Sequence, residues 1–400
     1  MNKYLRKITP QFIKRAYHKI RPTTSPAKTI LIAGWLGAFN LGDEMMLDVT
    51  LKSLKAQWPN CVITLLVHNI NTEVMQRYRD YKVVVRRSIS EATIEQLAHD
   101  NDIFWINGGA LLDDRDYGAA IVSDCGIKNE MTLAFDLARV AKAFFARHKK
   151  VFCYGLSTNR DIANPQFKRD YRELVDKSVH FSMRDTFSRN KFAQFADDTK
   201  IQLVDDLEFA DAAISKVSTA PPSDTIAIIP VLFNELMDGF EAFIKLLIET
   251  TDYNIKLILF YDEFDNDINL AFQLRQRLGD NSYRVNEIVV PRNSDELKNN
   301  LADVNAVFSM RYHGTLFAGA IGKPTVCINW DKHPHYYNKN KYLREHYGLV
   351  LSAINFSRFD KLNRSKIVKI LANLDAASPT RLKKIYRVAK HNLAKVIKKI

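Results

Sequence analysis

The stretch Val307–Ile328, VFSMRYHGTLFAGAIGKPTVCI, predicts a strand, a polar turn, a short helix and a second strand in succession. Its apolar start stops abruptly at Arg311 and His313, and apolar residues then recur at helical spacing until Gly322 and Pro324. In an open α/β sheet, this order places Arg311 and His313 at the carboxyl end of a strand and beside a helix N-terminus, where ligands and anions bind. We therefore expect the chemistry of the protein at this turn.

The same alternation of apolar strands, polar or glycine-rich turns and helices runs through the rest of the chain. Residues 218–224, STAPPSD, have the composition of a linker, and one series of strands precedes them while another follows. Two such series predict an α/β protein with two doubly wound, Rossmann-like domains that face each other across a cleft. The expected organisation is a basic amphipathic N-terminal tail (1–28), an N-terminal domain (29–217), the linker (218–224), a C-terminal domain (225–355) and a C-terminal helical segment with a basic amphipathic helix (356–400).

The net charge of +13 is confined to the two ends of the chain. Residues 1–28 and residues 379–400 each contain eight Lys or Arg and no acidic residue, which leaves 42 basic and 45 acidic residues between them. A protein that binds nucleic acid usually carries its positive charge on the globular face. The distribution therefore argues against a nucleic-acid partner.

Both basic ends carry apolar residues at helical spacing, and the pattern is stronger in residues 379–400. Such a helix could pack on the body of the protein or lie on an anionic membrane surface, and the sequence leaves both open. No apolar run is long enough to span a membrane, the basic N-terminus lacks the hydrophobic segment of a secretory signal, and the cysteines form no CxxC pair. We expect a cytoplasmic protein that could lie peripherally on the inner face of the membrane.

Glycine-rich turns follow two predicted strands of the N-terminal domain. One turn covers residues 34–44 and precedes a helix expected at 44–57, and the other begins at residue 107. Glycines let the backbone approach a ligand, and amide or carboxylate side chains can hydrogen-bond a hydroxylated one. The glycine spacing is wrong for the dinucleotide turn GxGxxG, and Asp43 could instead simply cap its helix. The expected substrate-binding residues of these turns are Asn40, Gly42, Asp43, Asn107, Gly108 and Gly109.

Two basic residues outside these turns are candidate anion ligands. Arg184 follows a predicted strand and could bind phosphate or carboxylate bidentately, or it could pair with Asp185 or another carboxylate. Lys332 lies just beyond the opening stretch. The segment 331–335 also contains an aspartate and two histidines, but no second cluster of fitting spacing accompanies them. We therefore expect no metal and no cofactor.

Taken in order, these motifs resemble those of the bacterial polysaccharide pyruvyl transferases over residues 30–350. Each motif is short, and their specificity comes from their order along the chain. Ala110, Tyr312 and Gly314 depart from the residues that are common in the family, which bears mainly on acceptor specificity. The matching motifs are Asn40-Leu41-Gly42-Asp43-Glu44, Asn107-Gly108-Gly109, Arg184-Asp185 with Ser188, Asp206, Arg311-x-His313 and Asp331-Lys332.

The resemblance implies a GT-B-like two-domain fold and the transfer of an enolpyruvyl group from phosphoenolpyruvate to a saccharide. In most such enzymes, phosphate leaves and the product is a cyclic pyruvate ketal. By the same resemblance, Arg184, Arg311 and Lys332 clamp the phosphate and the carboxylate, and His313 is an essential acid or base. The implied partners are phosphoenolpyruvate and a saccharide, which could be lipid-linked, in cell-surface or exopolysaccharide biosynthesis.

The chemistry independently requires such groups. Phosphoenolpyruvate carries several negative charges on a small frame, so its site needs two or three fixed cations. A histidine can exchange a proton near neutral pH. Which proton His313 moves stays open, and a structural role at the start of the following helix is the alternative. A nucleotide-sugar-dependent GT-B glycosyltransferase and a non-enzymatic membrane-surface scaffold of a polysaccharide assembly complex also fit the sequence.

Overall fold

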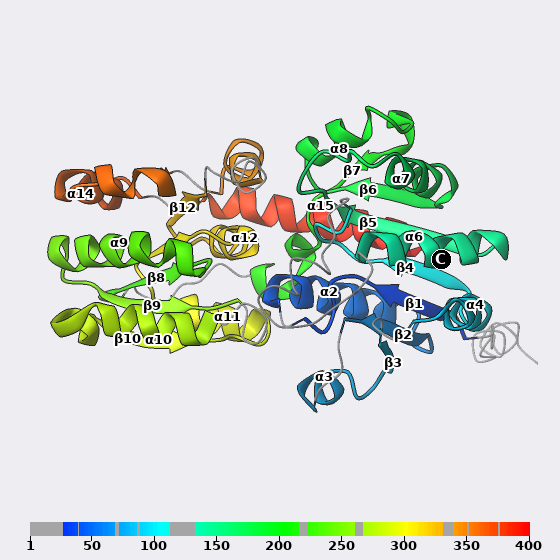
Figure 1. Cartoon of the computed structure of the whole chain (residues 1–400), viewed down its shortest axis with the longest axis horizontal. Coiled ribbons are helices and arrows are strands. Elements are labelled where there is room, and N and C mark those ends of the chain that lie inside the picture. The colour runs from blue at the N-terminus through cyan, green and yellow to red at the C-terminus, as the bar shows by residue number, and fades with distance from the viewer. Residues whose placement is uncertain are drawn as a thin grey trace, which may run out of the picture.

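The computed structural model contains two α/β halves that lie side by side along the longest axis of the molecule (Figure 1). Residues 1–26 of the expected N-terminal tail, residues 218–222 of the expected linker, and Lys332 lie outside the residues that the structure describes. The described residues are 27–38, 40–68, 72–85, 89–112, 133–215, 223–260, 267–330, 339–349, 352–374 and 377–400.

The first half is built on a seven-stranded sheet with the order β3-β2-β1-β4-β5-β6-β7, in which every pair of neighbours is parallel. Its central strands are apolar on both faces because helices cover both sides of the sheet. The strands are β1 (Thr29–Ala33), β2 (Val62–Val67), β3 (Lys82–Val85), β4 (Ile103–Ile106), β5 (Lys150–Leu156), β6 (His180–Met183) and β7 (Gln202–Leu203).

The helices of this half alternate with its strands along the chain. α2 starts at Leu41, earlier than expected, because Asn40 is its N-cap and accepts a hydrogen bond from the Gly42 amide at 3.2 Å. The idea that Asp43 caps this helix is therefore wrong. The helices are α2 (Leu41–Gln57), α3 (Thr72–Arg77), α4 (Glu91–Asp100), α6 (Leu133–Ala146), α7 (Pro165–Lys177) and α8 (Thr186–Phe192), with short 3-10 turns η2 (Asp198–Lys200), η3 (Leu207–Ala210) and η4 (Ala212–Ser215).

The second half repeats the plan with a six-stranded parallel sheet of order β10-β9-β8-β11-β12-β13. Its strands are β8 (Thr225–Ile229), β9 (Asn254–Ile258), β10 (Val285–Val289), β11 (Ala306–Ser309), β12 (Thr325–Asn329) and β13 (Ser352–Asn355). Its helices are α9 (Met237–Thr250), α10 (Asp267–Arg277), α11 (Ser294–Leu301), α12 (Tyr312–Ala320) and α14 (Arg364–Ala372), with the short helices η5 (Asn234–Leu236), η6 (Gly279–Arg284), η7 (Leu343–Tyr347) and η8 (Phe356–Lys361).

The predicted α/β class with two doubly wound sheets is confirmed by these strand orders. In each sheet the order reverses direction at one point, between β1 and β4 in the first and between β8 and β11 in the second. Ligands of open α/β sheets bind at the carboxyl ends of the strands at this switch point. The turns after β1, β4 and β11 are the three that carry the glycine-rich motifs and His313.

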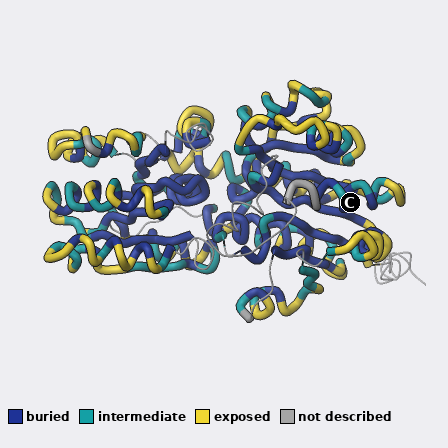
Figure 2. Tube along the Cα trace, in the orientation of Figure 1, coloured by how far each residue is buried: buried dark blue, intermediate teal, exposed yellow. Residues whose placement is uncertain are grey.

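Apolar side chains from both halves form one shared cluster between them. Leu41 and Met45 of α2 pack in the same cluster as Ile229 of β8 and Leu316 of α12, and buried residues are continuous through this junction (Figure 2). The Leu41 amide, which has no partner within its own helix, donates to the Phe260 carbonyl of the second half at 3.0 Å. The start of α2 is therefore held by the second half.

The last helix, α15 (Pro379–Ile397), returns from the second half to the first, where it contacts α2 and η3 (Figure 1). Leu393, Val396, Ile397 and Ile400 are buried in the same cluster as the strands β1 and β2. The sequence left open whether this apolar stripe packs on the body or faces a membrane, and the structure shows it packed on the body.

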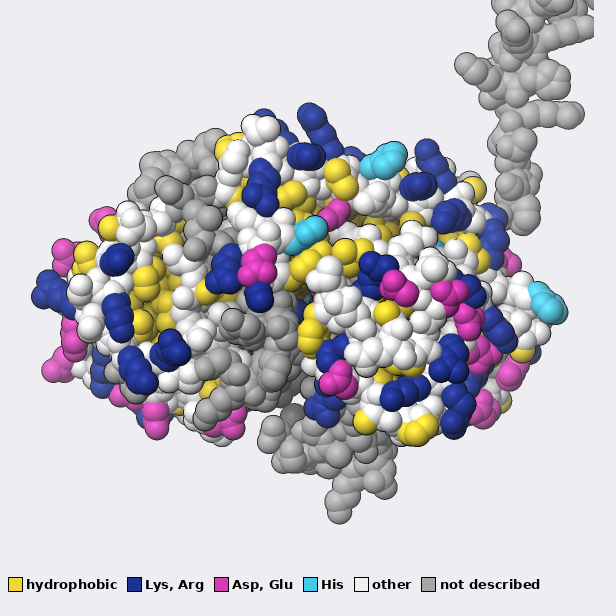
Figure 3. Space-filling model, turned by 90° about the horizontal axis from the view of Figure 1, so that it is seen from above, with side chains coloured by type: hydrophobic (Ala, Val, Ile, Leu, Met, Phe, Trp, Pro, Cys, Tyr) yellow, Lys and Arg dark blue, Asp and Glu magenta, His cyan; other side chains and the backbone are white. Residues whose placement is uncertain are grey.

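The charged surface is mixed on the face seen in Figure 3. Lys and Arg side chains are spread over both halves of that face, with Asp and Glu side chains among them. Among the described residues, no helix is both long and apolar enough to cross a bilayer.

Candidate active site

A buried contact joins the two halves at Arg184 and His313. Arg184 directly follows β6, and His313 is the second residue of α12. One guanidinium nitrogen, Nη1, lies 2.6 Å from Oδ2 of Asp206 and 2.9 Å from Nε2 of His313. The predicted cation and the predicted acid or base, 129 residues apart in the chain, are thus direct neighbours. The aromatic ring of Tyr312 packs against the same guanidinium at 4.7 Å from its centroid.

The carboxylate that pairs with Arg184 is Asp206 and not Asp185. Asp185 caps α8 instead, with its Oδ1 atom accepting from the Ser188 amide at 2.7 Å. Asp206 caps η3 in the same way, by accepting from the Glu208 amide at 3.0 Å, so its carboxylate is fixed at both oxygens. The sequence motif containing Arg184, Asp185 and Ser188 therefore includes one cationic residue of the site and the helix cap that follows it.

Hydrogen-bond geometry sets the protonation state of His313. A guanidinium only donates hydrogen bonds, so the Nε2 atom that faces Arg184 carries a lone pair and the imidazole is neutral. Burial lowers the pKa of His313, and the neighbouring Arg184 acts in the same direction, while Asp206 opposes them. The distance of 3.8 Å between Nε2 and Oδ2 of Asp206 is too long for a hydrogen bond, so that opposing effect is through-space attraction.

Gly42 lies against the ring of His313 across the junction. A Cβ atom built on Gly42 would be 1.9 Å from Nδ1 and 2.8 Å from Cβ of His313. Any larger residue at this position would collide with the histidine. The glycine of the first motif is therefore required by contact with the second half.

The two glycine-rich turns of the first half meet at Asp43. A Cβ atom on Gly109, whose φ is +130°, would lie 2.9 Å from Oδ1 of Asp43, and the Nδ2 atom of Asn40 donates to Oδ2 of Asp43 at 2.5 Å. Burial raises the pKa of Asp43 to about 8. The charge of Arg184 acts to lower this pKa, whereas the acidic groups of Glu44 and Asp206 raise it further. Asp43 therefore holds a proton at neutral pH in this environment.

Asn107 and Gly108 have structural contacts at the end of β4. The Oδ1 atom of Asn107 accepts from Thr50 at 2.6 Å and from the Trp105 indole at 3.3 Å. A Cβ atom on Gly108 would meet the sulfur of Met46 at 3.0 Å. The structure thus places both residues beside the site, with the Asn107 side chain oriented by α2 and β4.

Arg311, predicted to join the anion clamp, is held by other groups in this structure. Its Nη2 atom pairs with Oδ2 of Asp267 at 2.8 Å, and its Nε atom donates to the Pro230 carbonyl at 3.2 Å. All three groups lie in the second half, Pro230 at the end of β8 and Asp267 at the start of α10. Lys332, the third predicted cation, lies outside the described residues.

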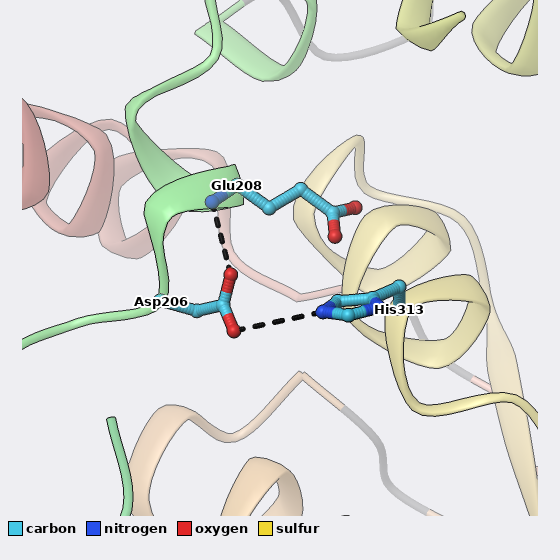
Figure 4. A group of neighbouring side chains, drawn as sticks. All are labelled: Asp206, Glu208 and His313. Carbon is cyan, nitrogen blue, oxygen red and sulfur yellow. Dashed lines mark hydrogen bonds and ion pairs between the residues drawn. The ribbon is translucent and has the colours of Figure 1, made fainter. Parts of the chain in front are cut away.

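Glu208 is a site residue that sequence reasoning missed. It is fully buried, lies two residues after Asp206, and its carboxyl group extends toward His313 (Figure 4). Neither carboxyl oxygen has a hydrogen-bond partner among the described residues. The signal that could have found it is a glutamate inside an otherwise apolar turn directly after the motif aspartate.

The cluster of Asp206, Glu208 and His313 offers ligand atoms that all lie within 4.8 Å of one another. A divalent ion between them would stand beside the guanidinium of Arg184, which already bonds to both Asp206 and His313. Charge repulsion disfavours two cations at this separation. We therefore interpret these residues as an acid–base group rather than a metal centre.

A family model described as polysaccharide pyruvyl transferase matches residues 40–332, a range that spans the motif turns and His313. This chain belongs to that family. No curated protein matches the sequence. Among solved structures, UDP-GlcNAc 2-epimerase from Methanocaldococcus jannaschii is similar at 12% identity and a TM-score of 0.54, with 91% of this chain and 99% of that one covered.

Two further solved structures extend the comparison of folds. UDP-GlcNAc 2-epimerase from Neisseria meningitidis is 11% identical with a TM-score of 0.51, covering 93% of this chain and 98% of that one. The lipopolysaccharide outer core galactosyltransferase WaaB is 11% identical with a TM-score of 0.50, and the match covers 93% of this chain and 100% of that one. At such identities the likeness concerns the fold alone, and it is the GT-B fold that the resemblance implied.

Proposed function

We propose that this member of the family transfers the enolpyruvyl group of phosphoenolpyruvate to a saccharide, forming a pyruvate ketal and releasing phosphate, in cell-surface or exopolysaccharide biosynthesis. The observation that carries the proposal is the buried contact of Arg184 with His313 at 2.9 Å. It brings a permanent cation and a neutral proton acceptor together at the junction of the two halves. A small, multiply charged enol phosphate needs both kinds of group.

Arg184, Arg311 and Lys332 form the anion clamp in this proposal. In the structure Arg184 pairs with Asp206, and Arg311 pairs with Asp267. When the donor binds, its phosphate and carboxylate would take the place of these aspartates as partners of the two arginines. Arginine forks suit both groups because each presents two parallel oxygens. The donor is phosphoenolpyruvate itself, so we propose neither a metal nor an organic cofactor.

The turns after β1 and β4 provide the remaining binding surface. Glycines there let substrate approach the backbone, and short polar side chains can donate hydrogen bonds to sugar hydroxyls or accept hydrogen bonds from them. Their position at the switch point of the first sheet supports this role. The residues concerned are Asn40, Gly42, Asp43, Asn107, Gly108 and Gly109.

A turnover assay tests the proposal. The protein is incubated with phosphoenolpyruvate and a panel of saccharide acceptors, and phosphate release is followed. We expect acceptor-dependent release that falls ~10²–10⁴-fold in a folded His313→Ala variant and stays unchanged in a His391→Ala control, since His391 is exposed on α15. Activity that depends on a nucleotide sugar instead would replace this function with glycosyl transfer, which the GT-B fold also supports.

We further propose that the enzyme works at the cytoplasmic face of an anionic membrane on lipid-linked saccharides. Basic residues at both ends of the chain support this location. Because the apolar stripe of α15 is buried in the protein, attraction by that helix would be electrostatic. Flotation with anionic vesicles should show binding that is lost at ~1 M salt, where the screening length is about 3 Å. Absence of binding at low salt would contradict this proposal. So would binding that is unchanged after deletion of residues 1–28 combined with replacement by glutamine of the exposed α15 residues Lys383, Lys384, Arg387 and Lys390.

A further inference from the structure

Glu208 combines complete burial with a carboxyl group that nothing described in the structure satisfies. Both oxygens lack hydrogen-bond partners among the described residues, and the residue is 0% exposed. Buried carboxylates in proteins are normally paired or accept several hydrogen bonds, because an isolated buried charge is very costly. An unpartnered carboxyl that points at a catalytic histidine is therefore best explained as an uncharged acid.

The charges around Glu208 act in the same direction. Asp206 and Asp211 flank it on the two sides of η3, whereas Asp43 of α2, which holds a proton at neutral pH, adds its negative charge only when it ionises at higher pH. The cation that opposes these charges, Arg184, already pairs with Asp206 at 2.6 Å. Burial is the largest cause that raises the pKa of Glu208 well above its usual value, and the charges of Asp206 and Asp211 raise it further. The charge of Arg184 acts to lower it.

The neighbouring histidine has the complementary state. Nε2 of His313 accepts from Arg184, so the imidazole is a neutral base with no proton at that nitrogen. One ring nitrogen of His313 and one carboxyl oxygen of Glu208 are at most 4.8 Å apart. One cluster therefore holds an uncharged acid and an uncharged base side by side, and the addition of a hydroxyl across an enol double bond needs one of each.

We propose that Glu208 is the general acid of the transfer and protonates C3 of the enolpyruvyl group, while His313 removes the proton of the acceptor hydroxyl. This assignment rests on the proposed function and names a second catalytic residue for it. It also assigns the proton that His313 moves.

The proton transfers balance over the whole reaction. Donor binding moves Arg184 from Nε2 of His313 to the phosphate, which frees that nitrogen to act as the base. In the first step, the acceptor oxygen bonds to C2, the electrons of the C2–C3 double bond take the Glu208 proton at C3, and Nε2 of His313 receives the hydroxyl proton. In the second step, a second hydroxyl bonds to C2 and the bond from C2 to the phosphate oxygen breaks. The imidazolium proton goes to the leaving phosphate, and the second hydroxyl proton restores Glu208. The products are the ketal and phosphate, and both side chains return to their starting states.

A spectroscopic measurement tests the uncharged acid independently of any turnover. Carboxyl signals of ¹³C-labelled glutamate are recorded at neutral pH for the full chain and for Glu208→Gln, with Glu235→Gln as the control because Glu235 is exposed. We expect one protonated-carboxyl signal that is lost only in Glu208→Gln. If the Glu208 signal is that of a carboxylate, the inference is wrong even when the enzyme is active.

Turnover then tests the catalytic role. Glu208→Gln keeps the shape of the side chain but cannot release a proton, so we expect kcat to fall ~10²–10⁴-fold with KM little changed, while Glu208→Asp keeps partial activity and Glu235→Gln is unaffected. Near-normal turnover of folded Glu208→Gln would overturn the assignment. Absence of phosphate release by the unmodified enzyme would overturn the proposed function, whereas the spectroscopic result would still stand.

A pH profile distinguishes a catalytic acid from a structural one. Asp211 accepts a hydrogen bond from Ser294 and its charge raises the pKa of Glu208. Removing that charge in Asp211→Asn should lower the pKa of the acid, so the loss of kcat at high pH should begin at a lower pH than in the unmodified enzyme. An unshifted profile would contradict the role of Glu208. Activity that a chelator abolishes, with a bound divalent ion lost in Glu208→Gln, would instead make the cluster a metal site.

Discussion

At Gly42 the backbone of the first half passes directly against the ring of His313. We expect Gly42→Ala to abolish most turnover, because its Cβ would lie 1.9 Å from Nδ1 and must displace the histidine or separate the halves. Such overpacking typically costs about 1–3 kcal/mol of stability. Kinetics and thermal unfolding measure the two effects.

Gly34→Ala is the matched control for that substitution. Gly34 lies in the same turn, but a Cβ there would make only ordinary contacts of 3.4 Å with Leu36 and 3.5 Å with Asn107. This variant should keep its turnover. Normal turnover of Gly42→Ala would mean that His313 acts from a different position than the one described.

Asp43 should make the stability of the protein depend on pH. Its pKa is raised to about 8 in the folded state and is ~3.9 in an unfolded chain. The folded state therefore binds more protons between these values, and the free energy of unfolding falls as pH rises through that window, by at most about 1.4 kcal/mol per pH unit.

Replacing Asp43 by asparagine removes this titration. Urea unfolding at several pH values should show the advantage of Asp43→Asn over the unmodified protein increasing toward pH 8. The exposed residue Asp280 supplies the control, since Asp280→Asn should follow the unmodified protein. A constant difference between Asp43→Asn and the unmodified protein would show that Asp43 does not titrate in this range.

Among the elements, α15 has a structural role that its composition conceals. Its basic residues suggest a surface helix, yet Leu393 is 1% exposed within the apolar cluster of the first half. Leu393→Ala should therefore lower the free energy of unfolding by ~2–5 kcal/mol. On the same helix, Val388 is 43% exposed, and Val388→Ala should change stability by no more than about 0.5 kcal/mol. Equal, small effects of both substitutions in urea unfolding would mean that α15 does not pack as described.

At the scale of the whole molecule, Arg77 of α3 links the first glycine-rich turn to the second half. It forms an ion pair with buried Glu44 at 3.2 Å and donates to the Arg292 carbonyl at 2.7 Å. We expect Arg77→Gln to cost about 1.5–3 kcal/mol, because Glu44 would lose its cation while the two halves lose a hydrogen bond. Urea unfolding measures the change.

An exposed ion pair provides the comparison for Arg77. Lys177 pairs with Glu173 at 2.7 Å on α7, with both side chains partly exposed, and Lys177→Gln should cost only about 0.3–0.5 kcal/mol. If Glu44 is the reason for the larger effect, adding Glu44→Gln to Arg77→Gln should recover part of the lost stability. A strictly additive double variant would contradict the coupling.

Much of the architecture could be predicted from the sequence because it follows from local periodicity. Strands buried on both faces are continuous apolar runs, and the turns at their carboxyl ends carry the glycines and polar residues of a binding site. For the same reason Arg184 and His313 could be named as site residues. The bounds of α2 were less predictable, since Asn40 and Asp43 are both good caps and only the backbone selects between them.

What the sequence alone determined was the order of elements, the two doubly wound sheets and the motifs of the family, all of which are encoded within short windows of the chain. Only the tertiary structure decided that Arg184 bonds to His313 and Asp206, that Arg311 pairs with Asp267, and that the stripe of α15 is covered. It also decided that Glu208 lies beside Asp206 and Asp211 with no hydrogen-bond partner for its carboxyl group in the described part of the chain. These facts depend on contacts between residues distant in sequence, and the charge state and burial of a side chain are set by the neighbours that folding brings to it.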